Sequence, residues 1–398
     1  MDDDDFLLLN PGPVPVRESV LDAMAEPMVS HRSAAFESIY ERAQTGVEYV
    51  FEQSTPTEQA TGDGTALLLN GTATMGMEAT VANLVGPEDH VVALVNGKFG
   101  RRFARIAERH TDNVTRVEVP WGESIPLSAV DDAVRPDTRL VTMVHNETST
   151  GLQNPAWGVG RLVADHDAYF AVDGVTSVGG DVFCIDDWHV DVAITDAQKA
   201  LETPPGISAV YVTSEVQNAF DGASAPFYED LDWHLRKAES HQTPFTSAVP
   251  LFRGMAEAVE AIEREGMPAR IDRHHRQARA FRAGFAALGL DRFPEASDHT
   301  VLSNTVTAIE LPEPIRGDPA AFFAAVEERN VSISGGQGHL SGDIFRVSNM
   351  GSLADEQVLR GVRVVGEALD AVGVDTDPAA GVAAAQEWVD VSLSGAHE

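Results

Sequence analysis

Cysteine is nearly absent from this chain of 398 residues, which contains only Cys184. A single thiol excludes an internal disulfide and a metal site built from several cysteines. The adjacent His274 and His275 would point to different faces of a helix, so we expect no metal there either. Apolar runs long enough to span a membrane are missing, and the N-terminus is acidic where a secretory signal would be basic. We therefore expect a soluble, cytoplasmic protein.

Positive charge is scarce as well. The chain has 28 basic and 62 acidic residues, a net charge of −34, which argues against nucleic acid and anionic membranes as partners. Only three of the basic residues are lysines, namely Lys98, Lys199 and Lys237. A merely acidic mesophilic enzyme would explain the charge but not the shortage of lysine. We interpret the composition as that of a halophilic protein from a salt-adapted cytoplasm, as in haloarchaea.

The first half of the chain alternates short apolar runs with helical patterns. The runs are continuous rather than alternating, as expected for strands that are covered on both faces. They occupy residues 67–70, 90–95, 114–119, 139–145, 169–173, 190–195 and 207–213. This alternation predicts an α/β fold with a seven-stranded, mostly parallel sheet flanked by helices. Only a loop, 196–206, separates the last two runs, so the final strand is either a short crossover or antiparallel.

The pattern changes after about residue 250. Longer helical segments and a few short strands there predict a smaller α+β domain. We expect an N-terminal segment at 1–20, a large domain at 21–255, a small domain at 256–373 and an acidic, loosely packed tail at 374–398. The proline-rich stretch 7–15 is not expected to form a regular element.

Polar residues that follow the predicted strands mark the candidate site, because ligands of open α/β sheets bind at the carboxyl ends of strands. The turn at 70–74, which includes Thr72 and Thr74, leads into a helix whose N-terminus suits a phosphate. Taken alone, an ordinary helix cap is the commoner explanation of such a turn.

Asp173 ends the fifth predicted strand, and Lys199 follows the sixth. A buried carboxylate needs a cationic or hydrogen-bonding partner, and a protonated pyridine nitrogen would be one. A lysine amine can condense with an aldehyde, whereas arginine cannot. A helix cap or a surface ion pair is the alternative for Asp173. Together with the turn, the two residues favour a Schiff-base lysine opposite a ring-binding acid.

Nine short motifs in this order resemble the class V aminotransferases of fold type I, in particular the alanine–glyoxylate and serine–pyruvate branch. The motifs are LLNPGP at 8–13, GTAT at 71–74, VNGKFG at 95–100, HNETSTG at 145–151, VDGVTS at 172–177, AQKAL at 197–201, PPG at 204–206, TPFT at 243–246 and FR at 345–346. The resemblance covers nearly the whole chain. It implies pyridoxal 5′-phosphate as cofactor and a homodimer with shared active sites.

The resemblance also assigns roles to the residues in these motifs. Lys199 would form the Schiff base and move the proton at Cα, and Asp173 would pair with the pyridine nitrogen. Phe99, where many relatives have Trp, and Val175 would cover the two faces of the ring, and Thr148 would bind near the ring oxygen. The implied phosphate ligands are Thr72, Ala73, Thr74 and Gln198, with Thr246 from the neighbouring subunit.

The substrate side is implied in the same way. Arg346 would hold the substrate α-carboxylate in a bidentate fork, and the backbone near Gly12 would close over it. An exposed strand arginine is the alternative, but the glycine-rich stretch at 334–338 just before it favours function. Some relatives also place a tyrosine near the phosphate, three residues before the threonine that corresponds to Thr246. In this chain that position is Thr243.

The expected reaction is a ping-pong transamination from a small amino acid (alanine, serine or aspartate) to a small 2-oxo acid (glyoxylate or pyruvate). A phosphoserine-type transaminase or a lyase on the same scaffold is an alternative, because the pair His31 and Arg32 resembles a phosphate-reading pair in phosphoserine aminotransferases. Cysteine desulfurases need a reactive cysteine late in the chain, where none occurs. The alternative of another class is a non-catalytic acidic binding protein in which Lys199 is a surface lysine.

Overall fold

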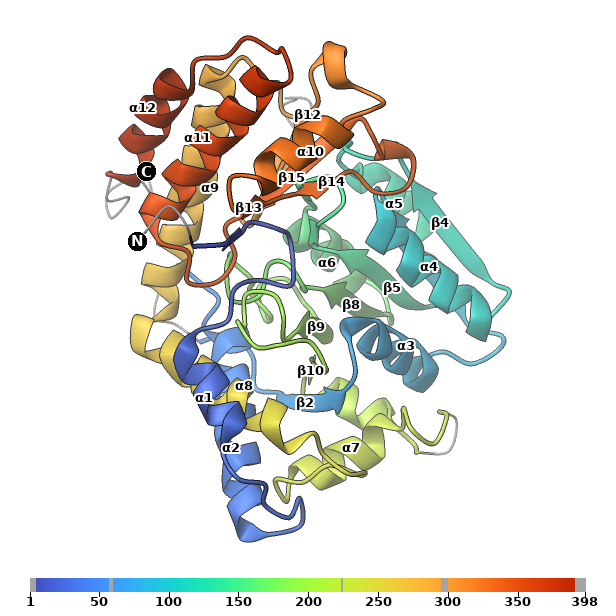
Figure 1. The fold of residues 1–398 in the computed structure, drawn as a ribbon. Coiled ribbons are helices and arrows are strands. Elements are labelled where there is room, and N and C mark those ends of the chain that lie inside the picture. Colours follow the sequence, from blue (N-terminus) through green and yellow to red (C-terminus); the bar gives the residue numbers. More distant parts are fainter. Residues whose placement is uncertain (1–4, 57–59, 223–224, 295–299, 391–398) are drawn as a thin grey trace.

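A seven-stranded sheet with helices on both faces forms the centre of the protein (Figure 1). The computed structural model describes residues 5–56, 60–222, 225–294 and 300–390. In spatial order the strands are β2 (Thr65–Asn70), β10 (Ile207–Val212), β9 (Val192–Asp196), β8 (Tyr169–Asp173), β5 (Thr138–Val144), β3 (His90–Val95) and β4 (Val114–Glu118). Only β10 is antiparallel to its neighbours. The predicted mostly parallel sheet is confirmed, and the last strand is the antiparallel one.

The helices that join the parallel strands lie on two different faces, as right-handed crossovers require. α3 (Ala73–Leu84) and α4 (Lys98–His110) pack together on one face, and α5 (Leu127–Ala133) and α6 (Ala156–Ala164) pack on the other. α2 (Ala34–Glu52) lies against β2 and packs on α8 (Val249–Glu265), beside α1 (Glu18–Ala25) and α7 (Leu231–Ala238). This cover explains why the inner strands of the sheet are apolar without alternation, whereas the edge strand β4 is only partly buried.

A second, smaller hydrophobic cluster is built on an antiparallel sheet of β12 (Val306–Glu310), β15 (Ile344–Ser348) and β14 (Ser334–Gly335). The helices around this sheet are α9 (Met267–Ala287), α10 (Ala320–Glu327) and α11 (Asp355–Ala371). α8 runs through the predicted domain boundary at 255/256, and its Val259 and Ile262 belong to the first cluster. The exact division into domains stays a prediction.

Two terminal segments differ from the expectation. The proline-rich stretch contains a short strand, β1 (Leu7–Leu8), which pairs in parallel with β13 (Val331–Ser332). Residues 374–390 are not a loose tail, because α12 (Pro378–Val389) packs on α9 and α11 and buries Ala385. The small residues that suggested looseness allow this packing: a Cβ on Gly381 would lie 2.8 Å from the Leu288 side chain. Residues 391–398 of the predicted tail lie outside the described residues.

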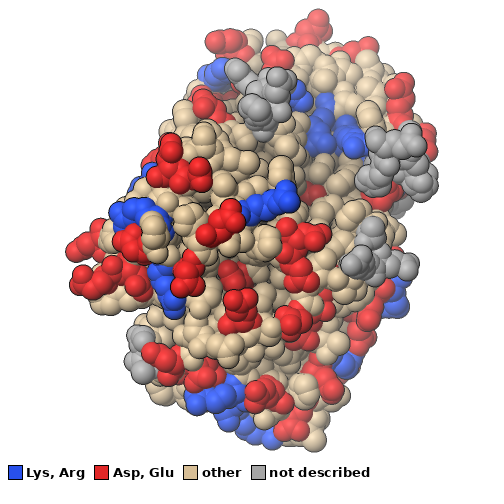
Figure 2. Space-filling view, turned by 180° about the vertical axis from the view of Figure 1, so that it is seen from behind, with Lys and Arg blue, Asp and Glu red and all other residues tan. Residues whose placement is uncertain are grey.

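The remaining regular elements are short. β6 (Asn146–Glu147), β7 (Leu152–Gln153) and β11 (Val301–Leu302) form a three-stranded sheet between the two clusters, and 3-10 turns cover Val216–Ala219, Glu313–Ile315 and Gly338–Leu340. None of the helices described here has the length and hydropathy of a membrane span. On the face turned away from the viewer of Figure 1, Asp and Glu side chains outnumber Lys and Arg across the surface (Figure 2).

Candidate active site

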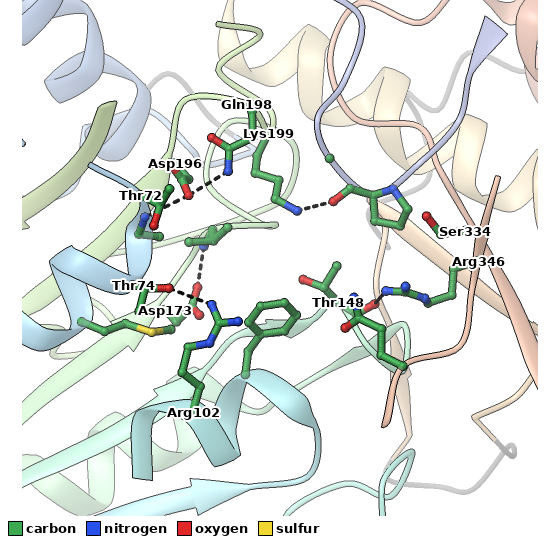
Figure 3. Close-up of a pocket in the computed structure, with 17 residues that line it drawn as sticks. Thr72, Thr74, Arg102, Thr148, Asp173, Asp196, Gln198, Lys199, Ser334 and Arg346 are labelled. Atoms are coloured by element: carbon green, nitrogen blue, oxygen red, sulfur yellow. Dashed lines mark hydrogen bonds between the residues drawn. The ribbon is translucent and has the colours of Figure 1, made fainter. Parts of the chain in front are cut away.

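A cavity of about 300 Å³ opens where β8 and β9 end and α3 begins (Figure 3). Parallel strands end at one edge of a sheet, so the polar residues after them meet there. The cavity is lined by all the predicted site residues except Thr246: Gly12, Thr72, Ala73, Thr74, Phe99, Thr148, Asp173, Val175, Gln198, Lys199 and Arg346. Lys199 and Asp173, which we predicted from the sequence to lie together, line the same cavity.

Lys199 is buried, with 9% of its surface exposed, and its Nζ donates to the carbonyl of Pro11. Burial lowers its pKa to about 8; the charges of Arg346 and Arg102 act in the same direction, and Asp196 and Asp173 oppose them. An amine with this pKa is partly neutral near neutral pH, which a nucleophile requires. The alternative of a surface lysine is therefore wrong.

Asp173 ends β8 and is 3% exposed. Its Oδ1 accepts from the backbone N–H of Val175 at 2.9 Å. Burial raises its pKa to about 7, the charge of Glu147 adds to this, and the N–H of Val175 and the charges of Lys199 and Arg102 oppose it. A carboxylate held this way has a strong electrostatic preference for a cationic partner in the cavity.

The start of α3 forms one end of the cavity. Thr72 is its extended N-cap, the helix begins at Ala73, and both residues line the cavity. Thr74 Oγ1 accepts from Arg102 Nη1 at 2.8 Å. The Ala73 N–H and the Gln198 amide donate to Asp196 Oδ2, at 2.9 Å and 2.8 Å. A helix N-terminus with these donors is an anion-binding end.

Phe99 is held by the buried carboxylate of Glu147. Glu147 Oε2 accepts from the N–H groups of Phe99 and Gly100, each at 3.1 Å, at the first turn of α4. Its Oε1 accepts from the N–H and hydroxyl of Ser149. The guanidinium of Arg102 lies 4.9 Å from the centre of the Phe99 ring. These contacts fix the aromatic ring at the wall of the cavity.

Arg346 comes from β15 and is 3% exposed. It donates Nη1 to the carbonyl of Thr148 at 2.8 Å, and Nε and Nη2 to that of Gly335 at 3.1 and 2.9 Å. Burial lowers its pKa to about 10, so it stays cationic at neutral pH. Guanidinium has five N–H donors, so two remain after these bonds to described residues.

Gly12 lies on the N-terminal segment and lines the cavity beside Lys199. Its φ of +107° is in the region that favours glycine. A Cβ there would come within 2.6 Å of Lys199 Nζ. Only glycine lets the backbone approach the amine this closely.

Thr246 and the pair His31 and Arg32 do not line this cavity in the single chain. The Thr246 carbonyl accepts from Asn70 Nδ2 at 3.4 Å. Arg32 donates to the side chain of Gln242 and to the carbonyls of residues 243, 244 and 245, at 2.7 to 3.3 Å. Arg32 therefore shapes the segment that leads to Thr246.

Sequence reasoning missed several lining residues: Pro11, Met77, Arg102, Asp196, Ser334 and Gln337. Two of them carried a signal. Asp196 ends a buried strand, the same criterion that identified Asp173. Arg102 lies three residues after Phe99 in a helical pattern, and residues with this spacing share a face.

Comparison with known proteins shows the family of this chain. A family model described as "Aminotransferase class-V" matches residues 6–354. The chain belongs to the class-V aminotransferases. An uncharacterized aminotransferase of Methanocaldococcus jannaschii is 35% identical over 96% of this chain and 97% of that protein. The L-aspartate–glyoxylate aminotransferase of Paracoccus denitrificans is 32% identical over 95% of this chain and 94% of the relative.

A solved structure agrees with these sequence relatives. The crystal structure of the pyridoxamine–pyruvate aminotransferase from Mesorhizobium loti superposes with a TM-score of 0.88 at 28% identity, covering 98% of each chain. The fold is thus that of fold type I pyridoxal-phosphate aminotransferases, as predicted, and the protein is an enzyme of this class. The non-catalytic binding protein considered from the sequence is excluded.

Pyridoxal phosphate is the cofactor of this class of enzyme. The cavity fits it in most respects: an amine with a lowered pKa, a buried acid with no cationic hydrogen-bond partner among the described residues, and a helix N-terminus lie in it together. Asp196 is the exception, because it places a negative charge at the anion-binding end.

Proposed function

We propose that this aminotransferase moves an amino group from a small amino acid, such as alanine, serine or aspartate, to a small 2-oxo acid, such as glyoxylate or pyruvate. The observation that carries the proposal is the presence of Lys199, Asp173 and Arg346 around one cavity of about 300 Å³. The glyoxylate activity in the name of the Paracoccus relative supports the acceptor class, and the resemblance of the motifs to the alanine–glyoxylate branch supports the donors.

Lys199 and Asp173 form the reactive core of the proposal. Lys199 would hold the cofactor covalently through Nζ, and Asp173 would pair with its ring nitrogen. When bound, pyridoxal phosphate supplies an electron-accepting ring that stabilises negative charge at the substrate Cα. The Lys199 amine, with its pKa lowered to about 8, can take up and return a proton at that carbon near neutral pH. The carboxylate of Asp173 would keep the ring nitrogen protonated.

The other lining residues would fix the position of the ring. Phe99 and Val175 would contact its two faces, and Thr148 would donate to the ring oxygen. We propose that the phosphate is bound by three residues at the start of α3 and by the side chain of Gln198. The three residues are Thr72, Ala73 and Thr74.

Arg346 and Gly12 would select the substrate. The N–H groups of Arg346 that remain after its bonds to Thr148 and Gly335 suit a bidentate carboxylate. Gly12 narrows the cavity next to Lys199, since its backbone lies against that side chain. A tight site with one carboxylate clamp favours amino acids with short side chains.

We further propose a homodimer in which Thr246 of one subunit completes the phosphate site of the other. Arg32 supports this arrangement, because its bonds hold residues 242–245 in place. The same bonds disfavour a phosphoserine substrate, which would need the Arg32 guanidinium for its own phosphate. Sedimentation that finds only monomer in the cofactor-loaded protein would contradict the dimer. We place the enzyme in a salt-adapted cytoplasm, on its charge and lysine scarcity.

Half-reactions test the substrate proposal directly. Alanine, serine and aspartate, added singly to the loaded enzyme, should bleach its visible absorption in a single turnover. Glyoxylate or pyruvate should restore the absorption. Bleaching by phosphoserine with recovery only by 2-oxoglutarate would replace this proposal with the phosphoserine alternative, and release of ammonia in a single step would favour a lyase.

A further inference from the structure

A carboxylate already occupies the anion-binding end of the cavity. Asp196, the last residue of β9, is 3% exposed and lies beside the start of α3 (Figure 3). Its Oδ2 accepts from the Ala73 N–H at 2.9 Å and from Gln198 Nε2 at 2.8 Å. Its Oδ1 is buried and accepts no hydrogen bond of ordinary geometry from the described residues.

The donors that Asp196 uses are those proposed for the cofactor phosphate. Ala73 and Gln198 are two of the four residues at that end of the cavity, and Thr74 receives a hydrogen bond from Arg102 there. A helix N-terminus stabilises one anion well, but a second anion beside the first is repelled. Burial strengthens that repulsion, because little solvent lies between the two charges.

Two cations of the cavity oppose the repulsion without removing it. Burial raises the pKa of Asp196 and the positive charge of Lys199 opposes this, but the Lys199 amine would become bound to the cofactor. Arg102 donates to Thr74, so it faces the same end of the cavity and would attract a phosphate. Within the described part of the chain, Asp196 is thus the carboxylate that shares donors with the proposed phosphate position.

We propose that Asp196 competes internally with the cofactor's 5′-phosphate and selectively lowers the affinity of the enzyme for phosphorylated pyridoxal. Phosphate binding requires Asp196 to release the Ala73 N–H, and it leaves Gln198 only one amide hydrogen for the phosphate unless Asp196 releases the other. The unphosphorylated vitamin, which carries the same aldehyde and ring, is not subject to this competition. The inference rests on cofactor binding in this cavity and is independent of which amino and oxo acids react.

Titration of the full-length apoenzyme with pyridoxal phosphate and with pyridoxal, followed by calorimetry, tests the proposal. Asp196→Asn keeps the size and the accepting oxygen but removes the charge, so the Kd for pyridoxal phosphate should fall at least tenfold. Asp196→Ala also frees the donors and should lower it further. The Kd for pyridoxal should change less than threefold in both variants. The covalent step at Lys199 is common to both ligands and cancels in their ratio.

Asp137→Asn is the matched control, since it removes the same charge from an exposed carboxylate outside the cavity. It should leave both Kd values unchanged. An Asp196→Asn variant that folds and binds pyridoxal phosphate no more tightly than the wild type would overturn the proposal. Equal gains for both ligands would also overturn it, because the competition would then not concern the phosphate. Failure of every protein to bind either ligand would instead remove the cofactor site itself, and this inference with it.

Discussion

Burial shapes the chemistry of single residues in this enzyme. The pKa of Asp173 rises to about 7 and that of Lys199 falls to about 8, so each group is close to its other protonation state at neutral pH. A cation bound next to Asp173 would return it firmly to the carboxylate form. Arg346 differs, because a guanidinium with a pKa of about 10 remains charged. The cavity therefore pairs adjustable groups with the fixed cations Arg346 and Arg102.

Replacing Arg346 by Gln should separate substrate binding from cofactor binding. We expect KM for the amino acid to rise about 100-fold, because a buried charge-assisted clamp is lost. The visible spectrum of the bound cofactor should persist. Steady-state kinetics and absorption spectra check both points. Arg316→Gln, at a half-exposed ion pair with Glu310, should change neither; loss of the cofactor from the Arg346 variant would contradict the clamp.

His145 gives a pH dependence with a defined sign. It is 2% exposed between the rings of Phe183 and Trp188, and burial lowers its pKa from 6.5 to about 4. Between these values the unfolded chain binds a proton that the folded protein does not, so stability is lost as the pH falls. From pH 7 to pH 4 the wild type should lose up to about 3 kcal/mol more than His145→Gln. Urea unfolding measures this difference; equal losses would show that His145 does not titrate in this way.

At the scale of elements, the loop that includes β6 connects the two sides of the cavity. Glu147 in this loop caps α4 and so holds Phe99, while the next residue, Thr148, accepts from Arg346 on β15. One turn of chain thus sets both the aromatic wall and the carboxylate clamp. Rigid elements on either side keep these groups in position.

Glu147→Gln tests this connection. An amide NH2 in place of one carboxylate oxygen would face N–H donors, so unfolding free energy should fall by about 1–3 kcal/mol. Cofactor affinity should fall with it, because Phe99 loses its anchor. Unfolding curves and cofactor titration measure the two effects. The matched change Glu118→Gln, at an exposed ion pair with Arg101, should stay within about 0.5 kcal/mol of wild type. Full stability in the Glu147 variant would refute the capping role.

Elements with a clear apolar run in their sequence were predictable, and those that depend on distant contacts were not. The sheet strands and the motif turns at their ends could be placed because both faces of the sheet are buried. α12 was missed because its alanines and glycines show no apolar face, and its order comes from packing on α9. Arg102 and Asp196 were missed because their partners, Thr74 and Ala73, are remote in sequence.

For the whole molecule, a net charge of −34 is the dominant feature. Acidic side chains spread over the face seen in Figure 2, so their mutual repulsion acts on the folded state. The Debye length falls to about 3 Å at 1 M salt, which removes most of this repulsion. The thermal unfolding midpoint should therefore rise clearly from dilute buffer to molar potassium chloride.

Calorimetry in salt and in sucrose separates charge screening from the general stabilisation by solutes that are excluded from the protein surface. Sucrose stabilises proteins in the second way without screening charge. Salt should raise the thermal unfolding midpoint much more than sucrose does. An unchanged midpoint between dilute buffer and molar salt would argue against a halophilic enzyme.

Reduction of the loaded enzyme with borohydride, followed by peptide mass spectrometry, directly tests whether Lys199 holds the cofactor in this cavity. We expect a pyridoxyl group on Lys199 alone, and no visible band in Lys199→Ala. The chain has only two other lysines, so the result is unambiguous. A pyridoxyl group on Lys98 or Lys237 instead would contradict the assignment of this cavity as the active site.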